Sequence, residues 1–404
     1  MKPEGRKRAR SLAAVSAALV LTLVLVEVTV TLPPPGEAAS PLNYKVVTFG
    51  SWNDRSPAWS PDGKTIAYVS DQNRVWQIFT MNPDGTSNRA ITPSSYNATN
   101  PSWSPNSSTI AFLSQAGSQF DVRVVFLVNS TVRTIAAAGT SAVQGGPEWS
   151  PDGRNLLFFV ASNATRLVSY DFTTMVSTSV ATVAGVNLSA CWVSQTEVVY
   201  DSLANGSYRL LWADVRNGTQ GVFLADNSSS TAPIFSSASS TIGYLSNLVP
   251  PNPYGNYYAG TYEDGDYNIW AMTLNGSDTS FQSGPTPRFG EANSMMDSWE
   301  LYLCPFTPGT ISPAQDIAWS ADGTVIAYVA VDRNLMPTVY LWEAFQSAST
   351  TGALANGVIN STDPAWAPDG FMLAFASAQG GFYHITLMNA TGAVMTLMPA
   401  TRYG

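Results

Sequence analysis

The residues best suited to ligand chemistry gather in two segments, 247–266 and 283–312. Exposed tyrosine, tryptophan and arginine are enriched where proteins bind partners, and loops on a rigid scaffold often carry binding sites. We expect a surface that binds a protein or a glycan, with these candidate residues: Tyr254, Tyr257, Tyr258, Tyr262, Glu263, Asp264, Asp266, Arg288, Trp299 and Tyr302. The alternative, in which these aromatic side chains pack on one another as a cap, stays open.

The sequence contains no complete catalytic constellation. Its one histidine, His384, is predicted to be a packing residue in a strand, and there is no G-x-S-x-G motif for a serine hydrolase. We therefore assign no catalytic residue. The alternative is an enzyme that cleaves glycans, a lyase or a hydrolase, through carboxylates that the sequence cannot pair.

Neither a metal site nor a cofactor is predicted. The run EDGD at residues 263–266 groups carboxylates around a glycine but lacks the full spacing of a calcium loop. Cys191 and Cys304, with a single histidine, are too few ligands for a zinc site. We expect two buried thiols, and a disulfide between them stays possible outside the cytoplasm.

A repeated pattern must position these segments. An apolar strand ends in Trp, a Ser-Pro-Asp-Gly turn follows, and a strand such as Ile-Ala-Tyr comes next. The anchoring aromatic residues, mostly 43 to 47 residues apart, are Trp59, Trp103, Trp149, Trp192, Phe235, Trp319 and Trp366. A unit of about 40–45 residues is the length of a four-stranded propeller blade. The repeated Asp62, Asp152, Asp322 and Asp369 are predicted to be structural turn residues.

The first unit divides into four short strands. We predict strands at 57–60, 65–70, 76–81 and 89–92, with Pro-Asp-Gly turns after the first and the third, in which Pro presets φ and Gly accepts positive φ. A second aromatic residue follows most anchors by nine positions, as Tyr68 follows Trp59. Bulky residues at fixed places suit sheets that bury both faces against their neighbours.

This pattern, WSPDG followed by IAYVS, IFTMNPDG and AIT, resembles the TolB-type β-propeller repeat, a relative of WD-repeat blades. The resemblance covers roughly residues 45–400 and implies an all-β propeller. The additional α/β domain that precedes the propeller in TolB has no counterpart here, so the role of TolB is not transferred. Similar propellers precede the catalytic domain of some serine peptidases, but this sequence ends at Gly404, directly after the last unit.

Seven anchors favour seven blades, with six or eight as alternatives because 84 residues separate Phe235 from Trp319. We interpret that gap as one blade with two long insertions, whose third strand is residues 267–274. The last blade either has its own fourth strand near residues 394–398, or residues 45–48 close the ring by pairing with it.

Composition limits the partners. The net charge is −9, and from residue 41 onward there are 14 basic and 25 acidic residues. Because binding to phosphates needs clustered Lys and Arg, nucleic acid is not an expected partner.

The first 40 residues form a separate region, with the propeller domain at residues 41–404. A basic start (Lys2 to Arg10), an apolar stretch at residues 11–32 and a Pro-rich linker describe either an uncleaved membrane anchor or a removed signal peptide. The basic flank would stay in the cytoplasm. We therefore expect the propeller outside the cytoplasm, either anchored to the membrane or secreted.

Asn-x-Ser/Thr sequences support that location. They occur eleven times, and we predict that all of them lie in loops, where a glycan could be attached. Asn-Gly-Ser and Asn-Ser-Ser are also ordinary turn sequences, which is an equally weighted interpretation. The candidate glycosylation sites are Asn97, Asn129, Asn163, Asn205, Asn217, Asn275 and Asn389.

Strand alternation predicts which face carries the two insertions. In each blade the loop between the second and third strands opens on the same face as the connection to the next blade. Residues 247–266 and 283–312 occupy those two kinds of position, so we expect them side by side on one face. Together these patterns favour a binding scaffold, with the glycan-cleaving enzyme as the alternative.

Overall fold

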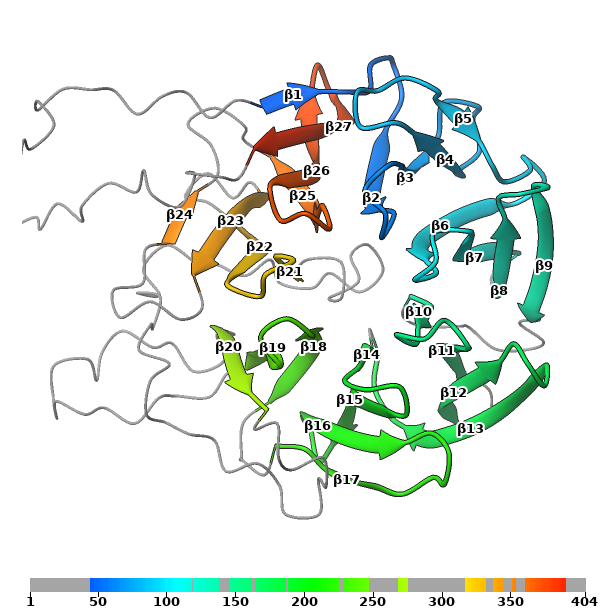
Figure 1. The fold of residues 1–404 in the computed structure, drawn as a ribbon, viewed down its shortest axis with the longest axis vertical. Coiled ribbons are helices and arrows are strands. Elements are labelled where there is room, and N and C mark those ends of the chain that lie inside the picture. Colours follow the sequence, from blue (N-terminus) through cyan, green and yellow to red (C-terminus); the bar gives the residue numbers. More distant parts are fainter. Residues whose placement is uncertain are drawn as a thin grey trace, which may run out of the picture. The chain divides into compact units, whose positions relative to one another are not determined.

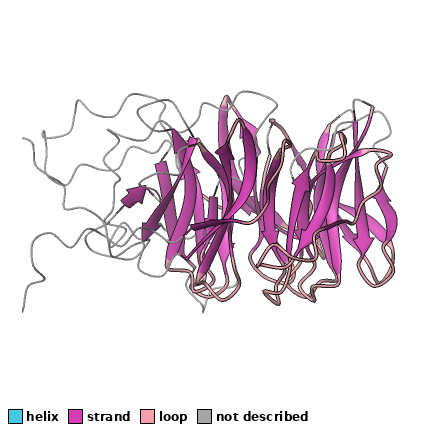
Figure 2. Cartoon of the chain, turned by 90° about the horizontal axis from the view of Figure 1, so that it is seen from above, coloured by secondary structure: helices cyan, strands magenta, loops and turns pink. Residues whose placement is uncertain are grey.

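The computed structural model describes residues 44–117, 119–137, 146–161, 164–186, 188–224, 229–246, 268–274, 317–331, 337–343, 351–353 and 360–389. These residues form strands and loops without a helix, as Figure 2 shows. Consequently no described helix is long and apolar enough to cross a membrane. The predicted N-terminal anchor or signal helix, residues 1–40, lies outside the described residues.

The strands form seven small antiparallel sheets, of which six have four strands and one has three. Sheet 1 consists of β2 (Asp54–Trp59), β3 (Ile66–Ser70), β4 (Gln77–Met81) and β5 (Arg89–Ala90). Sheet 2 consists of β6 (Asn97–Trp103), β7 (Thr109–Ala116), β8 (Gln119–Phe126) and β9 (Thr131–Ala136). Sheet 3 consists of β10 (Glu148–Trp149), β11 (Asn155–Ala161), β12 (Thr165–Asp171) and β13 (Val176–Val183).

Sheets 4 to 7 continue the same order along the chain. Sheet 4 consists of β14 (Ala190–Trp192), β15 (Glu197–Ala204), β16 (Ser207–Asp214) and β17 (Gln220–Val222), and sheet 5 of β18 (Ser230–Ser236), β19 (Thr241–Ser246) and β20 (Asn268–Thr273). Sheet 6 consists of β21 (Ile317–Trp319), β22 (Val325–Val331), β23 (Pro337–Glu343) and β24 (Thr351–Ala353). Sheet 7 consists of β25 (Ser361–Trp366), β26 (Met372–Gln379), β27 (Phe382–Asn389) and β1 (Tyr44–Val46). The third strand predicted at residues 267–274 is confirmed as β20, paired with β19.

The first strands of the sheets contact one another in cyclic order. β2 contacts β6, and the contacts then pass through β10, β14, β18, β21 and β25 back to β2. In Figure 1 these first strands are the innermost strands of their sheets. The all-β propeller class is therefore confirmed.

An N-terminal strand completes sheet 7. β1 pairs antiparallel with β27, with Tyr44 opposite Met388 and Val46 opposite Thr386. Of the two predicted ways to close the ring, pairing by residues 45–48 is the one observed, and residues 394–398 lie outside the described residues. The pairing covers the edge of β27 and joins the two ends of the repeat array.

The Ser-Pro-Asp-Gly turns have the predicted structural role. In sheet 1, the Ser60 hydroxyl donates to Asp62 Oδ1 at 2.7 Å, and the Thr65 amide donates to Ser60 Oγ at 3.0 Å. The same serine-to-aspartate bond recurs in sheet 3 and sheet 6 at 2.6 Å. Gly63 follows with φ of 71°, a left-handed conformation that glycine adopts without strain.

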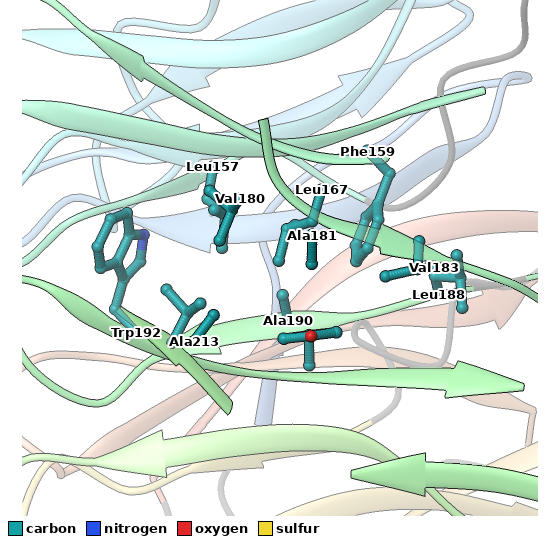
Figure 3. Close-up of a cluster of buried hydrophobic side chains, with 12 residues drawn as sticks. Leu157, Phe159, Leu167, Val180, Ala181, Val183, Leu188, Ala190, Trp192 and Ala213 are labelled. Atoms are coloured by element: carbon teal, nitrogen blue, oxygen red, sulfur yellow. The ribbon is translucent and has the colours of Figure 1, made fainter. Parts of the chain in front are cut away.

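The second aromatic residue of each unit lies in the core. Those of the seven sheets are at most 3% exposed: Tyr68, Phe112, Phe158, Tyr200, Tyr244, Tyr328 and Phe375. Apolar clusters join neighbouring sheets, and Figure 3 shows Leu157 and Leu167 of sheet 3 facing Trp192 of sheet 4. Because each large buried side chain contributes about 1.5–3 kcal/mol, these clusters account for the recurrence of bulky residues in the repeat.

Candidate functional site

The tryptophan anchors link consecutive first strands through their indole N–H groups. Trp103 donates from Nε1 to the carbonyl of Ala58 at 3.0 Å, and Trp149 donates to that of Ser102 at 3.1 Å. Trp192 continues the series with a 3.1 Å bond to the carbonyl of Glu148. In each case the acceptor directly precedes the anchor of the preceding sheet. The inner strands of sheets 1 to 4 therefore hold one another in a fixed register.

The first strands also carry a recurring bulge. Ser56, Asn100, Ala232 and Asp363, each three positions before its anchor, have φ between 49° and 54°. The pairing register shifts at these points. Left-handed backbone at a non-glycine residue is strained, and bulges often turn a strand edge toward a functional site.

Seven equivalent residues precede the anchors on these inner strands. All are half-buried, and they are Ala58, Ser102, Glu148, Cys191, Ile234, Ala318 and Ala365. We call this set the inner row. Six of its members are uncharged, so Glu148 is the one carboxylate of the inner row.

Glu148 lies at the inner edge of the apolar interface between sheets 3 and 4. It pairs with Leu157 of β11, which belongs to the same cluster as Trp192. Burial alone raises the pKa of the Glu148 carboxyl to about 7, and no described residue donates a hydrogen bond to it or forms an ion pair with it. The sequence analysis did not select this residue. Aligning the repeats would have revealed it, because Glu148 is the one charged residue at the position before the anchor.

Cys191 occupies the corresponding position in sheet 4. It makes no disulfide within the described part of the chain, and Cys304 lies outside it. Burial, and then the nearby Glu148 carboxylate, raise the pKa of the Cys191 thiol far above its ordinary value. A thiol held in its protonated form is a poor nucleophile, so Cys191 is not a reactive cysteine.

Asp201 of β15 is a second buried carboxylate in sheet 4. It accepts hydrogen bonds from the amide and hydroxyl of Ser189, at 2.9 and 2.8 Å, and from the amide of Ala232 at 3.2 Å. The hydroxyl of Thr231 also donates to it. Since Ala232 and Thr231 belong to sheet 5, Asp201 ties the two sheets together. Burial raises the pKa of the Asp201 carboxyl, and these bonds oppose the rise.

Polar contacts also join sheets 7 and 1. His384 of β27 is 5% exposed, as predicted for a packing residue, and its Nδ1 lies 3.5 Å from Asp54 Oδ2. The Ser56 amide donates to Asp363 Oδ2 at 3.1 Å. Burial raises the pKa of both Asp54 and Asp363. These two carboxylates lie at the contact between sheets 7 and 1, and Asp54 Oδ1 is buried without a hydrogen-bond partner among the described residues.

We call the face on which the second and third strands of each sheet are joined the 2–3 face. A shallow cleft of about 390 Å³ opens there between sheets 1 and 2, lined by Val75, Ser94, Ser95, Tyr96, Asn97, Gln115 and Gly117. The Tyr96 ring stacks on Phe112 and is covered on its other side by Arg123, whose guanidinium carbon is 4.4 Å from the ring centroid. Arg123 also bonds Asp121 at 2.8 Å. The wall is therefore rigid and the lining mostly uncharged and polar.

The ten predicted binding residues, from Tyr254 to Tyr302, all lie outside the described residues. The described strands fix only where the first insertion joins the fold: Ser246, at the end of β19, is paired with Asn268, at the start of β20. That end of sheet 5 belongs to the 2–3 face. Among the described residues, no group of three or more His, Cys, Asp or Glu side chains could hold a metal ion.

The candidate glycosylation sites differ in their surroundings. Asn129, Asn205 and Asn217 are exposed in turns, and Asn389 is exposed at the last position of β27. The prediction that all such sites lie in loops is wrong for Asn389, which ends β27, and for Asn97, which begins β6 opposite Gln115 and donates from Nδ2 to its side chain at 3.1 Å. Asn163 and Asn275 lie outside the described residues.

Residues 40–196 match the family described as the TolB beta propeller domain. The TolB-type β-propeller repeat is thus present in residues 40–196. Its solved structural neighbours include an oligogalacturonate lyase in complex with manganese, with a TM-score of 0.63, 12% identity, and 88% of this chain and 98% of that chain covered. An oligogalacturonate lyase from Vibrio parahaemolyticus gives a TM-score of 0.59 at 12% identity, covering 87% and 97%.

A third neighbour is the β-propeller domain of the Trilobed protease from Pyrococcus furiosus. Its TM-score is 0.55 at 14% identity, and 84% of this chain and 94% of that domain are covered. At such identities the TolB-type chain shares a fold with these proteins, and the likeness says nothing of activity. The function proposed below therefore rests on the geometry of this chain's own residues.

Proposed function

We propose that this chain is a binding scaffold, a closed propeller of seven blades that captures a protein or glycan partner with its 2–3 face. The three-stranded sheet 5 would be the blade that carries the two insertions. In the same proposal the first 40 residues place the propeller outside the cytoplasm, as a membrane anchor or a cleaved signal peptide.

One observation carries this proposal: the described cleft opens on the face from which the segment 247–267 leaves sheet 5 and returns to it. A polar cleft on the same face as a long Tyr-rich insertion has the composition of a recognition surface. The buried carboxylates Asp54, Asp201 and Asp363 are bound to groups of neighbouring sheets, so they serve the scaffold and leave the surface loops for binding.

The test replaces residues 247–266 with Asn-Gly in the full-length, detergent-solubilised chain. The paired ends of β19 and β20 tolerate a short connection, so we expect a change in Tm of about 2 °C or less. Capture should be measured by cross-linking to native surface membranes and on a printed glycan array, with bound species identified by mass spectrometry. Capture should fall by about tenfold or more, which corresponds to the loss of about 1.4 kcal/mol of binding free energy.

The matched control is Asn217→Ala, in the turn between the third and fourth strands of sheet 4, on the opposite face. This variant should retain full capture. If the deletion retains capture, or if Asn217→Ala loses as much, the 2–3 face is not the recognition surface.

A second function is favoured by the position of Glu148, the one carboxylate of the inner row, and burial raises the pKa of this carboxyl to about 7. A carboxyl that titrates near neutrality both accepts and donates a proton efficiently. Hydrolysis by a carboxylate pair would need a second acid, and the inner row provides only Glu148. A lyase needs one base: it takes the proton beside the uronate carboxylate, those electrons form a carbon–carbon double bond, and the glycosidic oxygen leaves.

This alternative is tested by incubating the chain with oligogalacturonate and following the ultraviolet absorbance of the unsaturated product. A lyase would show turnover that disappears in Glu148→Gln. Absence of turnover in the wild-type chain, or equal turnover in the variant, removes Glu148 from the catalytic role.

A further inference from the structure

The cleft between sheets 1 and 2 is suited to a neutral ligand. None of its seven lining residues carries a charge. Arg123, which covers the ring of the lining residue Tyr96, is already bonded to Asp121 at 2.8 Å. From residue 41 onward the chain has 25 acidic and 14 basic residues, and this excess repels an anion.

Two carboxamide side chains form a hydrogen-bonded chain that ends in the cleft. The Trp76 amide donates to Asn97 Oδ1, and Asn97 Nδ2 donates to Gln115 Oε1, both at 3.1 Å. Because a backbone N–H can only donate, the first bond fixes the orientation of the Asn97 amide, and the second then fixes that of Gln115. Both amide oxygens are engaged, whereas Gln115 Nε2 has no acceptor among the described residues.

Three hydroxyl groups of the lining are also uncommitted. Ser94 and Ser95 are exposed, and their hydroxyls make no hydrogen bond with the described residues. Tyr96 Oη is buried and likewise without a partner there, which is unfavourable unless a further polar group binds beside it. Every uncommitted side-chain group of the lining can therefore donate a hydrogen bond, and none of them is an acceptor only.

Such a lining distinguishes between two neutral ligands, a peptide backbone and a glycan. An extended peptide presents N–H and C=O groups alternately, so a lining of donors leaves part of its N–H groups unpaired. Sugar oxygens accept hydrogen bonds all round the ring, and an acetamido group adds a carbonyl oxygen and a methyl group. Val75, half-buried, is the one aliphatic side chain of the lining and offers a contact for that methyl group.

The size and the open side of the cleft suit one sugar residue of a longer chain. Its volume of about 390 Å³ is near the lower end for ligand pockets. A Cβ atom added to Gly117 would meet no atom within 4 Å. The cleft is therefore open at Gly117, where the rest of a glycan can leave it.

We propose that this cleft binds an acetamido sugar residue of a neutral glycan, with Gln115 Nε2 donating to the acetyl carbonyl and Val75 contacting the acetyl methyl group. This proposal rests on the recognition function and deepens it, since it names the partner as a glycan.

Saturation-transfer NMR and titration of the full-length, detergent-solubilised chain test the proposal. The chain is made in a host that attaches no N-glycans, so that Asn97 stays unmodified. The probe is methyl N-acetyl-β-glucosaminide, and its control is methyl β-glucoside, which has a hydroxyl in place of the acetamido group. The acetyl methyl protons should receive the strongest saturation, and the Kd of the glucoside should be about tenfold higher or more, because it lacks the carbonyl acceptor. Equal Kd values for the two sugars, or tighter binding of the peptide-backbone probe N-acetyl-glycine methylamide, would overturn the acetamido site.

Two variants locate the binding. Gln115→Glu keeps an oxygen that accepts from Asn97 and replaces the donor by an acceptor, so the Kd of the acetamido sugar should rise about tenfold. Gln72→Glu adds the same charge to the 2–3 loop of sheet 1 outside the lining, and it should keep the wild-type Kd. Gly117→Asn, at a φ of 68° that asparagine tolerates, fills the open side and should weaken binding even if Gln115→Glu does not fold. Wild-type affinity in Gln115→Glu or in Gly117→Asn would refute the assignment.

The chain in which Asn-Gly replaces residues 247–266 separates this proposal from the recognition function. Acetamido binding with the wild-type Kd in that chain would support the cleft, whether or not partner capture survives, and loss of acetamido binding there would overturn it. Loss of partner capture on the replacement, in a protein that does not prefer the acetamido sugar, would refute the cleft proposal and leave the recognition face standing.

Discussion

Two carboxylates on adjacent sheets, Asp201 and Glu148, have opposite surroundings: the first is fully buried and the second half-buried. Asp201, between sheets 4 and 5, receives four hydrogen bonds from Ser189, Thr231 and Ala232. Glu148, between sheets 3 and 4, receives none from the described residues, and burial raises its pKa to about 7. The first carboxylate is bonded to groups of two sheets, and the second lies at the inner edge of its sheet without a donor among the described residues. The difference shows that burial of an acid indicates a structural role only when donors accompany it.

The same distinction applies to the anchoring tryptophans. Trp103, Trp149 and Trp192 each donate to a neighbouring first strand, whereas the buried indole N–H groups of Trp59 and Trp366 have no partner among the described residues. Sheets 1 to 4 are thus joined by indole hydrogen bonds, whereas the indoles of sheets 1 and 7 make none with the described residues. Three experiments can break or sharpen this comparison.

The largest effect is expected from Asp201→Ala. It leaves buried donors of sheets 4 and 5 without an acceptor, and we expect the free energy of unfolding to fall by about 3–5 kcal/mol, measured by denaturant unfolding. Asp201→Asn keeps one acceptor oxygen and should lose less. If Asp201→Ala unfolds like the wild-type chain, the carboxylate is not what ties the sheets together.

A smaller effect of opposite sign is expected from Glu148→Gln at alkaline pH. The folded-state pKa of about 7 lies above the ordinary value of 4.5, so the folded state holds its proton more tightly and the wild-type chain loses stability as pH rises between these values. At pH 8 the variant should be more stable by about 2 kcal/mol, and near pH 4 the two should match. Equal stability at both pH values would mean that the Glu148 carboxylate is well solvated or paired.

The smallest effect compares Trp149→Phe with Trp366→Phe. Both substitutions remove similar apolar volume, but only the first removes an indole hydrogen bond, to the Ser102 carbonyl. The free energy of unfolding should therefore fall by about 1 kcal/mol more for Trp149→Phe. Phenylalanine is acceptable at this position of the repeat, because Phe235 occupies it in sheet 5. Identical losses would show that the indole links add nothing to stability.

Much of the architecture was predictable because it repeats within short stretches of chain. The turn after Trp59 predicts its own hydrogen bonds, since Ser60, Asp62 and Thr65 are only a few residues apart. The closing strand was one of two alternatives, because the sequence cannot say which end of the chain reaches β27. The Tyr383 amide bonds to Asn53, 330 residues away along the chain, and such a contact has no local signal.

The candidate site was much less predictable. Sequence reasoning pointed to Tyr- and acid-rich insertions because their residue types suit binding, and it passed over Glu148, which looks like any strand residue before a Trp. What distinguishes Glu148 is the absence of a donor among its described neighbours, whereas Asp201 finds donors in sheet 5. Both facts depend on which sheets come together.

The sequence by itself determined the repeating unit: its aromatic anchors, its Ser-Pro-Asp-Gly turns and its bulky residues at fixed places, since these depend on backbone geometry and on contacts within one unit. Only the tertiary structure decided how β1 closes the array and which acids are neutralised by neighbouring sheets. The physical reason is that the free energy of a buried charge is set by the donors and water around it, and here those donors come from strands distant in the chain.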